Sequence, residues 1–115
     1  MNEVKKIERI IQESVPGKQV TLAHVLASPM PDICERLGVA NIGAVGLMTF
    51  TSSETAIIAA DVATKSADVE IGFLDRFTGS LVIIGDVSSV ETSIESVNQM
   101  LSSMLGFTVV RVTRT

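Results

Sequence analysis

The chain has 115 residues and a net charge of −4, with 46% apolar residues and only 3% aromatic ones. This length suits one domain, and its core must consist of aliphatic side chains because Trp and Tyr are absent. Nucleic-acid binding is disfavoured, because neutralising phosphates requires clustered basic residues, and no basic run exceeds the pair Lys5 and Lys6.

The cysteine content and the hydropathy indicate the cellular compartment of the protein. A single cysteine, Cys34, excludes an internal disulfide, so a reducing cytoplasm is the natural compartment. The first residues carry no signal-peptide core, and no apolar run reaches the roughly 18–20 residues that span a membrane. We therefore expect a cytoplasmic protein that binds neither membranes nor nucleic acids. A mean hydropathy of +0.43 is high for a small domain and hints at burial in an assembly.

Residues 1–15 form a polar tail with regularly spaced apolar side chains. The spacing of Val4, Ile7 and Ile11 fits a helix, while the alternation of Ile7, Arg9 and Ile11 leaves a strand open. The period alone does not decide between these two structures.

A Pro-Gly turn begins the second part of the chain, residues 16–115. The alternating pattern of residues 19–27 predicts a strand that is covered on both faces. A short helix is expected at residues 32–37, with Gly38 as its C-terminal cap. A second strand is expected at residues 44–51.

Two longer helices are expected at residues 52–67 and 88–105, and each carries a capping-box signature. The first box begins at Thr51 and the second at Ser88, and both have a glutamate three residues later. Asp86 adds a negative charge that favours the second helix N-terminus.

Between these helices the sequence has the signature of a β-hairpin. Apolar runs at residues 69–74 and 81–84 flank a compact polar turn. A last strand is expected at residues 107–112. The order strand, helix, hairpin, helix, strand predicts a small α/β sandwich. The turn consists of Asp75, Arg76, Phe77, Thr78 and Gly79, and an adjacent charge pair in such a turn is ordinarily solvated.

The sequence carries no catalytic, cofactor-binding or metal-ligating constellation. His24 is the only histidine and lies in an apolar strand, so a packed or interface role outweighs that of a catalytic base. The glycines Gly72, Gly79 and Gly85 are too far apart for a phosphate-binding loop. We therefore predict a protein that is not an enzyme and that needs no cofactor or metal.

Several stretches resemble the bacterial microcompartment (BMC) shell proteins. Residues 59–71 look like the helix-to-strand segment of their shared domain, and residues 85–91 look like its Gly-Asp-Val entry into the second helix. The pieces that close the ordinary domain, at residues 24–29 and 32–37, precede the first strand of that domain here. The chain therefore resembles the circularly permuted shell proteins of ethanolamine and propanediol utilisation, the EutS and PduU type, over essentially its whole length. The match to this branch is close at residues 10–24, 72–79 and 112–115.

The resemblance implies a ferredoxin-like α/β fold and a structural role. Proteins of this type form hexamers that tile into the polyhedral shell of a bacterial organelle, where other shell proteins and encapsulated enzymes are the partners. The resemblance also implies that residues 1–15 of the subunits gather around the six-fold axis as a small parallel β-barrel, which makes the tail a strand. The implied barrel and pore residues are Ile7, Arg9, Ile10, Ile11, Gln12 and Glu13.

Two further assignments follow from the resemblance. Lys65 falls where the family carries an edge lysine that packs against the same lysine of a neighbouring hexamer. Without the family, Lys65 is a solvated cation that complements a helix C-terminus. The family's edge arginine has no counterpart at Ala27 and Ser28. The turn at residues 75–79 corresponds to the loop that lines the pore of unpermuted relatives, and it is shorter here.

A self-assembling shell protein is therefore the first hypothesis. The second is a small-metabolite-binding regulatory module on a ferredoxin-like fold, and the third is a minor enzyme of the same compartment. The absence of catalytic residues argues against the third, and the motif match favours the first. A discrete hexamer without ligand supports a shell role, whereas a monomer or dimer that tightens with a metabolite supports the regulatory module. The motifs do not distinguish ethanolamine from propanediol compartments.

Overall fold

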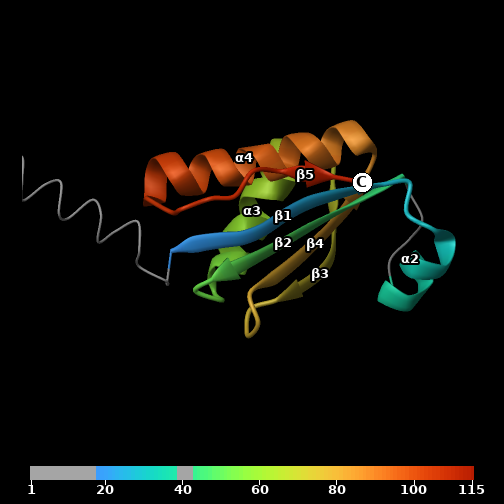
Figure 1. The fold of residues 1–115 in the computed structure, drawn as a ribbon, viewed down its shortest axis with the longest axis horizontal. Helices are drawn as coiled ribbons and strands as arrows, with labels where there is room; N and C mark the ends of the chain where they lie inside the picture. Colours follow the sequence, from blue (N-terminus) through green and yellow to red (C-terminus); the bar gives the residue numbers. More distant parts are fainter. Residues whose placement is uncertain (1–17, 39–42) are drawn as a thin grey trace, which may run out of the picture.

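The computed structural model describes residues 18–38 and 43–115 (Figure 1). The predictions made for residues 1–15 lie outside these residues. The described part contains five strands and three helices, in the order β1 (Gln19–Ala27), α2 (Pro31–Leu37), β2 (Ala44–Thr51), α3 (Thr55–Ser66), β3 (Glu70–Asp75), β4 (Ser80–Gly85), α4 (Val87–Leu105) and β5 (Thr113–Arg114).

The strands form one sheet in the order β3-β4-β2-β1-β5. Neighbouring strands are antiparallel except for β1 and β5, which are parallel, so the sheet is mixed. Helices α3 and α4 lie on one face of this sheet, and α2 stands apart from the other described elements (Figure 1). The predicted α/β sandwich is confirmed.

The core lies between the sheet and its two covering helices. Small side chains on α3 and an apolar stripe on α4 let both helices pack close to the strands. At Gly46 a Cβ atom would lie only 2.7 Å from Ile94 and 2.8 Å from Ile83, so a glycine is needed at this contact. The largest fully buried side chains are Met48, Leu81, Ile83, Ile94 and Leu101.

Both predicted capping boxes are wrong, for different reasons. Helix α3 begins only at Thr55, and its N-cap residue, Glu54, makes no capping hydrogen bond through its side chain. At α4 the cap is Asp86, whose carboxylate accepts hydrogen bonds from the backbone N–H and the hydroxyl of Ser89, both at 2.9 Å. A carboxylate that accepts two bonds caps more effectively than the hydroxyl of Ser88, so the helix starts before the predicted box.

The predicted last strand at residues 107–112 is also wrong. Only one bridge, between Gln19 and Thr108, forms there, and the regular pairing with β1 begins at Thr113. One cause is visible in the hydrogen bonding, because the backbone carbonyl of Val110 accepts from the Asn98 side chain at 2.8 Å. That bond directs this stretch toward α4 instead of the sheet.

Candidate functional site

The strand register gives the sheet a hairpin end. At this end Gln19, the first residue of β1, pairs with Thr51, the last residue of β2. The β3–β4 hairpin turns at the same end, because Ser80 pairs with both Thr49 and Asp75. The first described residues of the chain therefore lie at the end that carries the hairpin turn.

The opposite end of the sheet, which we call the far end, carries the C-terminal turn of α3. Ala44 pairs with Ala27 and with Gly85 at this end, and α2 extends beyond it (Figure 1). Helix α3 follows the hairpin end of β2 and precedes the far end of β3. Lys65, in its last turn, thus lies at the far end.

The hairpin turn is held by a carboxylate. The backbone N–H groups of Phe77 and Thr78 donate to Asp75 at 2.8 and 3.3 Å. The bond from the Phe77 N–H, followed by hydrogen bonding from the Thr78 side chain, lowers the pKa of Asp75 below its usual range, so it stays ionised at neutral pH. The turn presents Phe77, which is 79% exposed, with the Arg76 guanidinium 4.9 Å from its ring centre.

Lys65 is an exposed cation with a partner on its own helix. Its Nζ donates to the Asp61 carboxylate at 2.8 Å, and 74% of its side chain is exposed. An exposed pair of this kind is weak, so Lys65 can be redirected toward another molecule at little cost.

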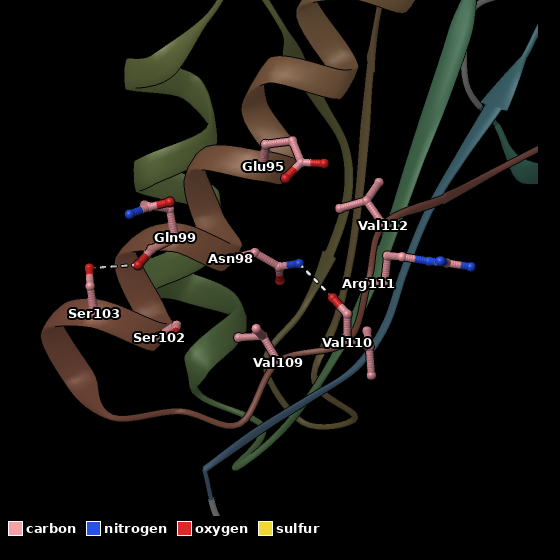
Figure 2. Close-up of a pocket in the computed structure, with 9 residues that line it drawn as sticks. All are labelled: Glu95, Asn98, Gln99, Ser102, Ser103, Val109, Val110, Arg111 and Val112. Atoms are coloured by element: carbon pink, nitrogen blue, oxygen red, sulfur yellow. Dashed lines mark hydrogen bonds between the residues drawn. The ribbon is translucent and has the colours of Figure 1, made fainter.

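A groove of about 350 Å³ lies between α4 and the C-terminal segment, and we call it the α4 groove (Figure 2). Asn98 forms its floor and is only 7% exposed. The Asn98 amide N–H points to Val110, as Figure 2 shows, while its carbonyl oxygen has no hydrogen-bond partner among the described residues. The lining residues are Glu95, Asn98, Gln99, Ser102, Ser103, Val109, Val110, Arg111 and Val112.

The His24 side chain is hydrogen-bonded to the C-terminal residues of the chain. Its Nδ1 is hydrogen-bonded to the Thr113 hydroxyl at 2.5 Å and its Nε2 to the Thr115 hydroxyl at 2.9 Å. Within residues 18–38 and 43–115, no three His, Cys, Asp or Glu side chains are grouped as metal ligands would be. No helix in the same ranges is both long and apolar enough to cross a membrane.

The structure brings some predicted site residues together and leaves others apart. Residues 75–79 form one turn at the hairpin end, and Lys65 lies at the far end. The predicted barrel residues at positions 7–13 lie outside the described residues. Sequence reasoning missed the α4 groove, for which the only signal was the polar Asn98 beside the apolar stripe of α4.

Comparison with known proteins decides the family. Residues 44–112 match the protein family described as "BMC domain". The chain belongs to the BMC family. The match starts at β2, so β1 and α2 of this BMC protein precede the matched region.

Three named relatives cover almost the whole BMC chain. The shell protein CutR of Streptococcus intermedius is 54% identical over 99% of this chain and 98% of its own length. PduU of Salmonella typhimurium is 54% identical over 94% of each chain, and EutS of Escherichia coli K12 is 52% identical over 93% of this chain and 96% of its own. Each is named a bacterial microcompartment shell protein. This BMC protein is likewise a structural shell protein of a microcompartment and not an enzyme.

Solved structures agree with the fold. The CutR flat hexamer, form 1, has a TM-score of 0.85 and 51% identity, and covers 90% of this chain and 95% of that one. A second CutR assembly is a screw with a pitch of 41.9 Å; it has a TM-score of 0.83 and 50% identity over 87% of this chain and all of that one. CutR has thus been solved both as a flat hexamer and as a screw.

Proposed function

We propose that this protein forms hexamers that tile into the microcompartment shell, with the hairpin end at the six-fold axis and the far end at the rim. The observation that carries this orientation is the register of the sheet. In this register the hairpin turn and the junction with residues 1–17 lie at one end of the sheet, and Lys65 lies at the other end. CutR, 51% identical, forms flat hexamers.

In this arrangement the domain, residues 16–115, builds the ring and residues 1–15 build the axial barrel. Six tails leave six domains near the axis and pair with one another, because a single strand cannot satisfy its own backbone groups. The barrel and pore residues of this tail are Ile7, Arg9, Ile10, Ile11, Gln12 and Glu13. It restricts the central opening.

The hairpin turns lie around the same opening. Each turn contributes Asp75, Arg76, Phe77, Thr78 and Gly79, and the six copies surround the base of the barrel. At the rim, Lys65 meets the same residue of a neighbouring hexamer, and other shell proteins occupy equivalent edges. Encapsulated enzymes are the further partners of such a shell.

The size of the purified protein tests the assembly. Light scattering is expected to give a mass of six times 12.2 kDa over a wide range of protein concentration. A monomer mass over that range contradicts the proposal, and a dimer that tightens with a metabolite favours the regulatory alternative.

Hydrogen exchange tests the barrel separately. Residues 7–14 are expected to exchange slowly in the hexamer and rapidly in any monomeric variant, while the sheet exchanges slowly in both. Deletion of residues 1–15 is the matching variant, and its domain should remain folded because the core lies within residues 18–115. Rapid exchange of residues 7–14 in an intact hexamer excludes the barrel.

A further inference from the structure

Lys65 by itself offers little attraction between two hexamers at the rim of the proposed assembly. It already has a partner on its own helix, because its Nζ lies 2.8 Å from the Asp61 carboxylate. Each copy of this exposed pair is neutral as a whole, so two copies that meet attract each other only weakly. Another surface at the far end of the sheet must therefore supply the attraction that holds neighbouring hexamers together.

Helix α2 extends beyond the far end of the sheet. Figure 1 shows it past the ends of β1 and β2 and below them in that view, whereas α4 lies above them. The backbone of α2 lies close to no other helix or strand that the structure describes. The exposed side chains of this helix include Pro31, Asp32, Ile33, Glu35 and Arg36. The described part of the domain thus gives α2 no packing partner.

One side of α2 carries apolar side chains. Met30, directly before the helix, and Ile33 are three positions apart, and the Ile33 N–H donates to the Met30 carbonyl at 2.9 Å, so the two side chains share one side. They are 69% and 44% exposed. Asp32 and Arg36 pair with each other at 3.3 Å on another side of the helix. An unpartnered helix with one apolar side indicates an interaction site.

The symmetry of the rim determines the partner of this helix. Where a residue meets its own copy, as Lys65 does in the proposed assembly, the contact is two-fold symmetric and the same patch is used on both sides. An element that extends past the rim beside such an axis meets its own copy as well. The partner for the apolar side of α2 is therefore a second copy of this chain, in the neighbouring hexamer.

We propose that α2 packs against α2 of the neighbouring hexamer through Met30 and Ile33, and that this apolar contact holds the edges of the shell together. The contact rests on the tiling hexamers proposed above and names the surface by which they tile. Lys65 lies at the same edge, while Asp32 and Arg36 remain in solvent.

Sheet formation by serine variants tests this contact. The double variant Met30→Ser and Ile33→Ser loses both apolar side chains but keeps the charged pair of α2. Light scattering should still show hexamers. The protein concentration at which electron microscopy detects sheets should rise by about tenfold or more, the factor that burial of one such side chain contributes. Glu35→Ser, at an exposed position of the same helix, is the matched control and should form sheets at the parent's concentration.

Disulfide formation locates the contact independently of its strength. In a Cys34→Ser background, Ile33→Cys should give covalent dimers when sheets are oxidised, because two copies of this position meet. The same variant oxidised as dispersed hexamers should give no dimers. Glu35→Cys, on the charged side of the helix, should remain monomeric on a denaturing gel in both states.

The outcomes separate this contact from the assembly itself. If the serine variant forms sheets at the parent's concentration, or if sheets of Ile33→Cys give no dimers, the α2 contact is wrong and the tiling hexamer stands. If Ile33→Cys forms no sheets, Met30→Cys replaces it, and absence of dimers there overturns the contact. If the parent forms hexamers that never tile, tiling and the α2 contact both fail, and a monomeric parent overturns the whole assembly.

Discussion

At the scale of single residues, Gly46 shows how one missing side chain sets a distance between layers. Three side-chain atoms, from Ile83, Val90 and Ile94, would lie within 2.9 Å of a Cβ atom at this position. These neighbours are buried between the sheet and α4, so they have little space to retreat. Gly46 therefore fixes how closely α4 approaches the middle of the sheet.

We expect Gly46→Ala to destabilise the domain by about 1–3 kcal/mol, because an added methyl group in a packed core forces its neighbours out of their positions. Chemical denaturation followed by circular dichroism measures this change in the free energy of unfolding. Thr92→Ala, at an exposed position of α4, is the control and should change stability little. Equal stability of the two variants contradicts the packing described.

A second residue-scale prediction concerns acid. The backbone N–H of Ser89, followed by its hydroxyl, lowers the pKa of Asp86. Because the pKa of Asp86 is lower in the folded chain than the usual value of about 3.9, its cap stabilises the fold above that value. This contribution is lost as the pH falls through the lowered pKa. Stability should therefore decrease below about pH 4.

Asp86→Asn separates this residue from other acids. Asparagine also caps helices but does not titrate, so the variant should lose less stability than the parent between neutral and acidic pH. Denaturation curves at several pH values measure the difference. Identical pH dependence in parent and variant rules out Asp86 as a contributor.

At the scale of elements, α4 is tied to its neighbours by two polar side chains as well as by its apolar stripe. The buried hydroxyl of Ser93 donates to the carbonyl of Ala63 on α3 at 2.9 Å. Asn98 donates to Val110 in the C-terminal segment. These bonds give α4 a defined rotation against both partners, and the second one shapes the α4 groove.

Asn98→Ala should release the C-terminal segment from α4. The carbonyl of Val110 loses its partner, and a net cost of about 1–2 kcal/mol is expected for such a bond. Hydrogen exchange should become faster at residues 109–112 and change little in β2 and β4. Ser103→Ala, which removes an exposed bond to the Gln99 carbonyl of α4, is the control. Unchanged exchange at residues 109–112 contradicts the proposed role of Asn98.

Local signals in the sequence predict most elements, and contacts between distant residues explain the exceptions. The alternating pattern predicts β1 and β2, and the glycines predict the helix C-terminal caps at Gly38 and Gly106. The structure confirms these elements. The place where the last strand begins depends on the hydrogen bond from Asn98 to Val110. No local sequence pattern reveals this contact. The hairpin turn could be predicted because it is one continuous segment. The α4 groove could not, because the contact between α4 and the C-terminal segment creates it.

At the scale of the whole molecule, the two ends of the sheet have different tasks in the proposed assembly. The hairpin end faces copies of itself around one axis, whereas the far end faces other hexamers. Substitutions at the far end should therefore affect tiling without affecting the ring.

Lys65→Asp tests this division. The variant places a carboxylate where two copies of one position meet, so hexamers should persist while sheets and shell incorporation are lost. Light scattering measures the ring, and electron microscopy of sheets measures tiling. Lys65→Arg is the matched control because it keeps the charge, and it should still tile. If the Asp variant tiles as well as the parent, Lys65 does not lie at the edge.

The bonds of His24 have a consequence for how the chain folds. They join β1 to residues that are 89 and 91 positions away in sequence, and β5 pairs with β1 along the same stretch. Contacts of such high separation require a long loop to close before they stabilise anything, and they slow folding. β1 and β2 can pair early, because their neighbouring ends are separated only by α2 and a short connection. The outer edge of β1 can pair with β5 only after the long loop between them has closed. In kinetic refolding, the bonds of Thr113 and Thr115 to His24 should therefore form last.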